Sequence, residues 1–189
     1  MKVMLLTPPL PPLFKRHVRE RYKPFPLGIA YLGSVLRKSS YDVELIYSGA
    51  LKLNSKKLLS SIEERKPDIV GFSVLSPHLD RAASFATLIK GKYPSISTVI
   101  GNVHATALPV ETLRAYSDFD FLFSGESEDS FLKFIAAIHA QSHNFSSIKG
   151  LAYREENDVV FSGEPSGVKD LDALPFPAWD LFYTQDGYP

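Results

Sequence analysis

Cysteine is absent from the 189 residues of this sequence. Its absence excludes disulfide bonds, thiol nucleophiles, thiolate zinc sites and cysteine-ligated iron–sulfur clusters within these residues. Apolar runs of about 18 residues, the length that spans a bilayer, are absent too, and the apolar stretch near the N-terminus is too short for a signal peptide. We therefore expect a cytoplasmic protein with no membrane partner.

Net charge is missing as well, because 21 Lys and Arg residues balance 21 Asp and Glu residues. Proteins that bind nucleic acid through its phosphates are normally basic, so we expect no nucleic-acid partner. The sequence has no G-x-x-x-x-G-K-[ST], G-x-G-x-x-G, G-x-S-x-G or H-E-x-x-H motif. These absences disfavour nucleotide hydrolysis, dinucleotide binding, hydrolase chemistry and a helical zinc site. We predict no catalytic residue and no metal ligand in the chain.

Short apolar segments, each bounded by turn residues, predict five buried strands. They are Lys2 to Thr7, Val43 to Tyr47, Asp68 to Ser73, Thr98 to Ile100 and Phe119 to Phe123. Segments with helical spacing alternate with them, namely Leu27 to Lys38, Ser55 to Arg65, Leu79 to Lys92, Val110 to Tyr116 and Ser130 to Ala140. The alternation predicts an α/β fold, a flavodoxin-like (Rossmann-like) five-stranded parallel sheet with strand order 2-1-3-4-5.

The pattern changes after this sheet, which we expect to occupy residues 1–147. Two extended pieces, Gly150 to Arg154 and Val159 to Ser162, flank a polar turn and predict a C-terminal β-hairpin within residues 148–168. Residues 169–189 are punctuated by proline and carry aromatic residues without periodicity. They predict a linker, and we expect its aromatic residues to be poorly ordered or to pack on another chain.

Small and polar residues follow four strands that are neighbours in this strand order. In doubly wound sheets, ligands bind beyond the carboxyl ends of the strands near the switch in strand order. The residues at these ends, with the start of the first helix, form the predicted binding set: Pro9, Leu27, Gly28, Ser73, Val74, Leu75, Gly101, Asn102, Val103, His104, Ala105, Gly125 and Glu126.

Each member of this set also has a structural interpretation. Gly101 and Gly125 serve equally well as turn glycines, and Gly33 is best explained by tight helix-on-sheet packing. Gly28 fits either close packing or close approach of a ligand. A loop anchor is the favoured role for His104, ahead of a metal ligand or proton donor. The carboxylates of Glu126 and Glu128 suit the start of a helix, where we expect at least one to act as a cap.

Six short blocks occur along the chain: Thr7-Pro8-Pro9, Pro26-Leu27-Gly28-Ile29-Ala30-Tyr31-Leu32, Gly71-Phe72-Ser73, Gly101-Asn102-Val103-His104-Ala105-Thr106, Gly125-Glu126-Ser127-Glu128 and Leu174-Pro175-Phe176-Pro177-Ala178-Trp179-Asp180. Together they resemble the N-terminal cobalamin-binding domain of cobalamin-dependent radical S-adenosylmethionine (SAM) enzymes. They occur in the order of that family and span nearly the whole chain. One departure is Asn102, which stands where the family has the second glycine of a pair.

The resemblance implies a module that binds cobalamin with its nucleotide tail tucked into the domain. The Asp-x-His-x-x-Gly motif of methionine-synthase-like domains is absent, so the resemblance implies no protein histidine on cobalt. It also implies a partner, a radical SAM barrel of the same full-length chain, which would carry SAM and the [4Fe–4S] cluster. The fragment itself would not be catalytic, and its parent would be a methyltransferase or a related radical enzyme.

Two other functions remain open from the sequence. One is an interaction or scaffold domain that keeps the fold without a cofactor, for which the side chain of Asn102 is the best argument. The other is a flavodoxin-like domain that binds FMN or another planar ligand. For the cobalamin interpretation we predict a broad apolar shelf across the carboxyl ends of strands three, four and five, because small residues there let a large ligand approach.

Overall fold

The computed structural model describes residues 1–10, 26–48, 52–142, 144–156 and 158–182, which build one seven-stranded sheet in the order β2-β1-β3-β4-β5-β6-β7. The strands are β1 (Lys2–Thr7), β2 (Asp42–Tyr47), β3 (Ile69–Ser73), β4 (Ser97–Gly101), β5 (Phe121–Phe123), β6 (Leu151–Glu155) and β7 (Asp158–Phe161). The first five are parallel, whereas β6 and β7 are antiparallel additions beside β5. The predicted fold class, strand order and hairpin are confirmed.

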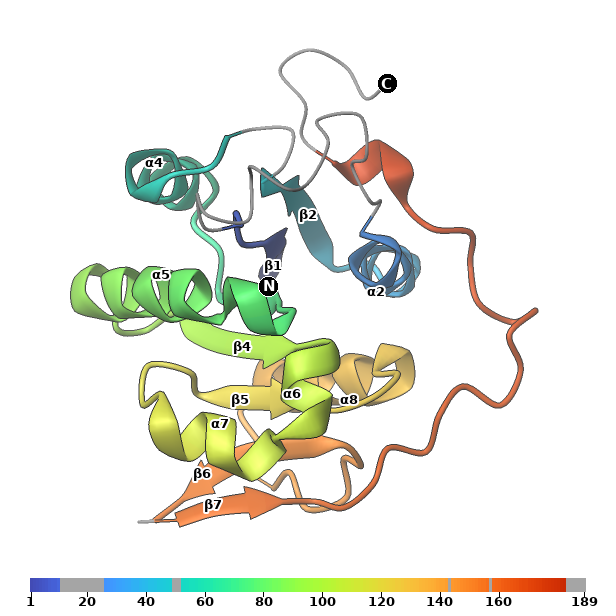
Figure 1. Ribbon diagram of the computed structural model, residues 1–189. Coiled ribbons are helices and arrows are strands. Elements are labelled where there is room, and N and C mark those ends of the chain that lie inside the picture. The colour runs from blue at the N-terminus through green and yellow to red at the C-terminus, as the bar shows by residue number, and fades with distance from the viewer. Residues whose placement is uncertain (11–25, 49–51, 143, 157, 183–189) are drawn as a thin grey trace.

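Helices cover both faces of the sheet (Figure 1). One face carries α2 (Leu27–Lys38) and α8 (Glu128–His139), and the other carries α4 (Ser55–Arg65), α5 (Leu79–Lys92), α6 (Val103–Ala107) and α7 (Pro109–Ala115). Short 3-10 turns occupy Ser76–His78 and Trp179–Leu181. The predicted bounds of α2, α4 and α5 match the structure. Among the described residues, no helix has the length and apolarity needed to cross a membrane.

Local chemistry explains where the helices begin. Asn54 caps α4 by accepting a hydrogen bond from the Lys57 amide at 3.0 Å. Helix α7 begins at Pro109, which suits the first helical position because its missing N–H would have no partner there. Helix α6 was not predicted, since five residues are too few to show helical periodicity. The segment after β4 is therefore helical where the sequence indicated a loop.

The core has one apolar layer on each face of the sheet, because side chains alternate along each strand. Met4 and Leu6 of β1 contact the layer under α4 and α5, whereas Val3 and Leu5 contact the layer under α2 and α8. The second layer is rich in phenylalanine rings in edge-to-face contact. These include the pairs Phe121–Phe134, Phe121–Phe145 and Phe123–Phe131, with ring centroids 4.7, 5.4 and 5.2 Å apart.

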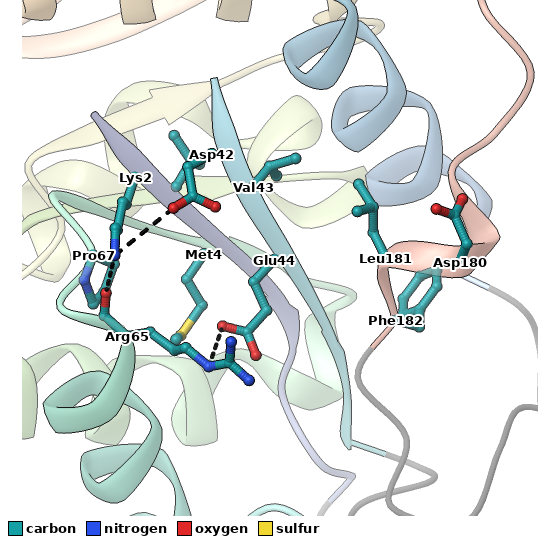
Figure 2. A pocket seen from close by; sticks show the side chains of 11 residues that line it. Lys2, Met4, Asp42, Val43, Glu44, Arg65, Pro67, Asp180, Leu181 and Phe182 are labelled. Atoms are coloured by element: carbon teal, nitrogen blue, oxygen red, sulfur yellow. Dashed lines mark hydrogen bonds and ion pairs between the residues drawn. The ribbon is translucent and has the colours of Figure 1, made fainter. Parts of the chain in front are cut away.

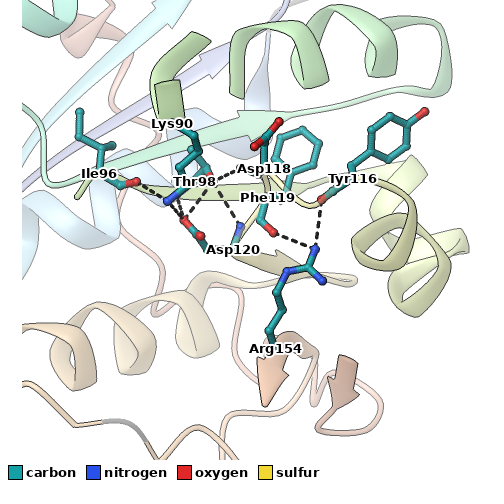
Figure 3. A network of polar contacts seen from close by, with 8 residues as sticks. All are labelled: Lys90, Ile96, Thr98, Tyr116, Asp118, Phe119, Asp120 and Arg154. Atoms are coloured by element: carbon teal, nitrogen blue, oxygen red, sulfur yellow. Dashed lines mark hydrogen bonds and ion pairs between the residues drawn. The ribbon is translucent and has the colours of Figure 1, made fainter. Parts of the chain in front are cut away.

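Polar contacts hold the amino-terminal edge of the sheet together (Figure 3). The Asp120 carboxylate accepts hydrogen bonds from the Thr98 amide at 2.8 Å and the Thr98 hydroxyl at 3.0 Å, and it pairs with Lys90. The Arg154 guanidinium on β6 donates to three carbonyl oxygens in and after α7, those of Leu113, Tyr116 and Phe119. Figure 3 draws the contacts with Tyr116 and Phe119. These charged groups connect β4, β5, β6 and α7, so we assign them a structural role.

The C-terminal segment returns to the same domain, which corrects the expectation for the linker. The Ala178 amide donates to the Ala30 carbonyl of α2 at 3.0 Å, and Phe182 forms a parallel bridge with Leu45 on β2. Ala178 and Phe182 are buried, whereas Phe176 is 94% exposed. The expectation is wrong for Phe182 because the edge strand β2 and helix α2 supply the docking surface. Residues 183–189 lie outside the described part of the chain.

Candidate cofactor-binding site

An apolar cavity of about 240 Å³ lies at the carboxyl ends of β1, β3, β4 and β5, between α2 and α8. We call it the α2/α8 slot. Its lining is mostly apolar: Leu5, Ile29, Leu32, Phe72, Val99, Ile100, Phe123 and Phe131. Smaller or polar residues complete it: Gly28, Gly71, Ser73, Gly101, Asn102, Gly125, Glu126, Ser127 and Glu128. The slot therefore combines an apolar lining with polar groups near the strand ends, as small-molecule sites commonly do.

The slot contains part of the predicted binding set. Six predicted residues line it: Gly28, Ser73, Gly101, Asn102, Gly125 and Glu126. The other seven do not: Val74 and Ala105 are buried in the core, Pro9 and His104 are half-buried, and Leu27, Leu75 and Val103 are exposed at the same end of the sheet. The shelf predicted for strands three to five is thus a narrower slot that also takes in β1 and the two helices.

Gly28 and Gly71 line the slot, and they differ in what lies where a side chain would be. A Cβ at Gly28, in the first turn of α2, would meet no atom within 4 Å apart from its two chain neighbours and the backbone of its own helix. The backbone there therefore faces open space. A Cβ at Gly71, in the middle of β3, would lie 2.6 Å from Cδ2 of Leu5. Sequence reasoning did not select Gly71, although a glycine inside a buried strand often marks close approach of a ligand or of another backbone.

Two other glycines have structural explanations. Gly125 has a φ of +67°, and its Cβ would lie 2.5 Å from Cγ of Pro165. Its missing side chain is thus required by the turn and by Pro165, although the residue lines the slot. A Cβ at Gly33 would lie 3.0 Å from Cδ1 of Leu45, which confirms the tight packing predicted there.

His104 lies on α6 and links two loops. Its Nδ1 is 3.1 Å from the Ser76 hydroxyl, and its amide donates to the Val74 carbonyl at 3.3 Å. These contacts support the anchor role, with the correction that the anchor is a helical residue.

A second histidine, His78, lies two positions after Ser76 in the chain. Burial lowers the pKa of its imidazole. His78 is therefore neutral near pH 7, and its buried Nδ1 has no hydrogen-bond partner among the described residues.

Glu128 supplies an unused acceptor at the start of α8. Its Oε2 is buried and has no hydrogen-bond partner among the described residues. Glu128 is the first residue of α8, and the N-cap Ser127 makes no side-chain capping bond. Glu126 is exposed. The helix dipole favours a carboxylate in the first turn, but the expected cap is not found, because neither glutamate makes a capping hydrogen bond among the described residues. The unpaired oxygen of Glu128 can accept a hydrogen bond from a ligand in the slot.

The chain matches the B12 binding domain family over residues 20–135, which is more than half of its length. The chain belongs to the B12-binding domain family. It is 28% identical to cytidylyl-2-hydroxyethylphosphonate methyltransferase of Streptomyces wedmorensis, in an alignment covering 94% of this chain and 40% of that protein. It is 26% identical to anaerobic magnesium-protoporphyrin IX monomethyl ester cyclase of Cereibacter sphaeroides, covering 82% of this chain and 26% of that protein.

A solved structure shares the fold of this B12-binding domain. The cobalamin-dependent SAM radical enzyme OxsB, solved with aqua-cobalamin and SAM bound, superposes with a TM-score of 0.77 at 21% identity. The match covers 95% of this chain and 24% of OxsB. This B12-binding domain thus resembles the cobalamin-binding module of cobalamin-dependent radical SAM enzymes, and it spans well under half the length of the relatives and the structure that it matches.

The residues of the slot fit part of a corrinoid. The cavity is smaller than the roughly 300–1,000 Å³ typical of pockets for drug-sized ligands, so a corrinoid cannot enter whole. Its apolar walls and the open space beside Gly28 suit a flat apolar portion of such a ligand. The acceptor on Glu128 suits one of its N–H or O–H donors. That no histidine of this chain ligates cobalt stays a prediction.

A larger cavity of about 420 Å³ lies at the opposite, amino-terminal end of β1 and β2 (Figure 2). Its charged side chains contact one another. Nε of Arg65 is 3.5 Å from Oε2 of Glu44, which makes an ion pair without a hydrogen bond, and Nζ of Lys2 is 3.8 Å from the Asp42 carboxylate. The smaller α2/α8 slot is the candidate cofactor site, because it lies at the carboxyl ends of the strands where doubly wound sheets bind ligands.

Proposed function

We propose that this B12-binding domain binds cobalamin at the α2/α8 slot and holds it as the cobalamin module of a radical SAM enzyme. The observation that carries the proposal is an apolar slot at the carboxyl ends of the parallel strands, with open space beside Gly28. When bound, cobalamin supplies a cobalt centre for group transfer or radical chemistry. The chain's own contribution is to bind, to orient and to exclude water.

The side chains of the slot divide these tasks. Leu5, Val99 and Phe131 provide apolar contact that keeps water from the inserted part of the cofactor. Gly28 leaves open space that this part can occupy, whereas Gly71 lets Leu5 of β1 pack closely on β3. The free Oε2 of Glu128 accepts a hydrogen bond from the ligand and thereby orients it.

The proposal includes a partner, the radical SAM barrel of a longer chain, which would hold SAM and the [4Fe–4S] cluster. Apolar side chains at the carboxyl end of the sheet support it, since Leu27, Leu75, Val103 and Leu108 are 49%, 43%, 61% and 46% exposed. The parent reaction is methyl transfer or a related radical reaction. The boundaries at residues 147 and 168, the cytoplasmic location and the lack of nucleic-acid or membrane partners remain predictions.

Titration of the chain with hydroxocobalamin tests the proposal. A ligand at about 100 times its dissociation constant stabilises a fold by about 2.7 kcal/mol. For a chain of this size this corresponds to a rise of about 5–10 °C in melting temperature. Absence of a shift with hydroxocobalamin would contradict the proposal, and a shift with FMN alone would favour the planar-ligand alternative.

A matched pair of variants locates the site. Gly28 on α2 and Gly91 on α5 are both helical glycines. A Cβ added at either would meet no atom within 4 Å apart from its chain neighbours and the backbone of its own helix. Leucine favours a helix over glycine by up to about 1 kcal/mol, so Gly28→Leu and Gly91→Leu should both fold. Only Gly28→Leu should abolish the shift, because its side chain fills the slot. Equal binding by the two variants would place the cofactor elsewhere.

A further inference from the structure

Asn102 adopts a backbone conformation that other residues avoid. Its φ is +83° and its ψ is −167°, a region that is almost exclusive to glycine. The residue is exposed, follows β4 directly and lines the α2/α8 slot. A non-glycine residue persists in such a region only where surrounding contacts hold it there.

Those contacts are hydrogen bonds of the Asn102 side chain. Its Nδ2 donates to the Ser73 hydroxyl at the end of β3 over 2.9 Å, and its Oδ1 accepts from the Val103 amide at the start of α6 over 2.7 Å. Both polar atoms of the side chain are therefore engaged by the protein. The side chain is held along the strand ends, so it does not project freely into the slot.

The backbone of Asn102 extends this connection to a third strand. Its carbonyl oxygen accepts from the Thr106 amide at 2.9 Å and from the Thr106 hydroxyl at 3.1 Å. The same hydroxyl accepts from the Gly125 amide, just after β5, at 2.9 Å. Ser73, Asn102, Thr106 and Gly125 thus form a continuous hydrogen-bonded bracket across the carboxyl ends of β3, β4 and β5. Three of its members, Ser73, Asn102 and Gly125, line the slot.

We propose that Asn102 is a positioning residue, which holds the ends of β3, β4 and β5 at the spacing that cobalamin requires. This inference rests on the proposed function and concerns the residue that differs from the glycine of the resembled family. A glycine would adopt the same backbone angles without strain, but it would lack the bond to Ser73. Asparagine adopts strained backbone angles, and its hydrogen bonds order the rim of the α2/α8 slot before the ligand binds. This order lowers the entropic cost of binding.

The test compares Asn102→Gly, Asn102→Ala and wild type by apo melting temperature and by dissociation constant for hydroxocobalamin. In Asn102→Gly, relief of strain offsets the lost hydrogen bonds, so the melting temperature should stay within about 3 °C. Its dissociation constant should rise about fivefold, the factor that corresponds to one net hydrogen bond. Asn102→Ala keeps the strain and loses the bonds, so both its melting temperature and its affinity should fall.

The bond to Ser73 is tested by a double-mutant cycle. Ser73→Ala and Asn102→Gly both remove the hydrogen bond between these two side chains, so each should weaken hydroxocobalamin binding, and the double variant should lose little more than Asn102→Gly alone. Ser73→Thr retains a hydroxyl acceptor and should therefore lose less affinity than Ser73→Ala. If Asn102 served only folding, the Asn102 and Ser73 variants would not be coupled in their dissociation constants. Their effects would instead appear in the apo melting temperature.

A control is Asn144→Gly, since Asn144 also bonds a nearby backbone amide, that of Ser146, but does not line the slot. It should leave the dissociation constant unchanged. Equal or tighter binding by Asn102→Gly would show that Asn102 crowds the ligand, and additive losses in the double variant would show that Ser73 acts independently. Either result overturns this inference alone, whereas absence of binding by wild type overturns the proposed function together with it.

Discussion

Glu44 on β2 is the buried carboxylate of the amino-terminal cavity. Its side chain is 18% exposed and forms an ion pair with Arg65 at the end of α4 (Figure 2). Burial raises the pKa of Glu44 above its ordinary value of 4.5, and the positive charge of Arg65 only partly opposes this effect. The ionised form of Glu44 is therefore less favourable in the folded chain than in the unfolded chain.

A pH-dependent gain in stability follows for Glu44→Gln. The folded state holds the proton of Glu44 more tightly than the unfolded state does, so the free energy of unfolding falls as pH rises from 4.5 through the folded pKa. Glutamine carries no charge and avoids this cost. The variant should exceed wild type in unfolding free energy at pH 7, and the gain should vanish below about pH 4.

Urea unfolding at several pH values measures this difference. Glu164→Gln is a suitable control, because Glu164 is exposed and surface substitutions usually change stability by less than about 0.5 kcal/mol. A Glu44→Gln variant that is less stable at pH 7 would show that the ion pair with Arg65 outweighs the cost of burial.

The return segment around Trp179–Leu181 covers the edge of β2 and the outer side of α2. Ala178 and Phe182 are buried there, and Asp180 pairs with Arg37 of α2. An edge strand with unpaired backbone groups is a liability that proteins cover with other elements. This segment therefore belongs to the fold of the domain.

The variants Phe182→Ala and Phe176→Ala test whether this segment is docked on the domain. Removing the buried Phe182 side chain should cost about 3 kcal/mol of unfolding free energy, or roughly 6–12 °C in melting temperature. Phe176 is 94% exposed, so the same substitution there should have little effect. Thermal unfolding measures both, and similar melting temperatures for the two variants would mean that the segment is not docked in solution.

The whole chain lacks the thiolate ligands of an iron–sulfur cluster, which starts radical chemistry by cleaving SAM. With no cysteine, it supplies no thiolate for an iron–sulfur cluster that cleaves SAM. After iron and sulfide reconstitution, the isolated chain should yield no 5′-deoxyadenosine from SAM above a blank without protein. Chromatography of the products makes the measurement, with a cysteine-containing radical SAM enzyme as positive control. Product above the blank would show that an initiating site exists within these residues.

Sequence alone determined the architecture of this domain. Apolar runs mark β1 to β5, and helical spacing with Asn54 and Pro109 marks the helices, because these signals arise from neighbouring residues. The same local signals selected residues that line the candidate slot, such as Gly101 and Asn102, since turn residues must follow the strands. Helix α6 was not predicted, because its five residues are too few to show helical periodicity.

Only the tertiary structure decided the shape of the site. Leu5, Val99 and Phe131 come from β1, β4 and α8, and nothing in their own segments distinguishes them from other core residues. Pro165, forty positions after Gly125 in the chain, explains why Gly125 lacks a side chain. Phe182 packs on a surface that β2 and α2 form together. Cavities and docked segments depend on contacts between distant residues, and local periodicity carries no information about such contacts.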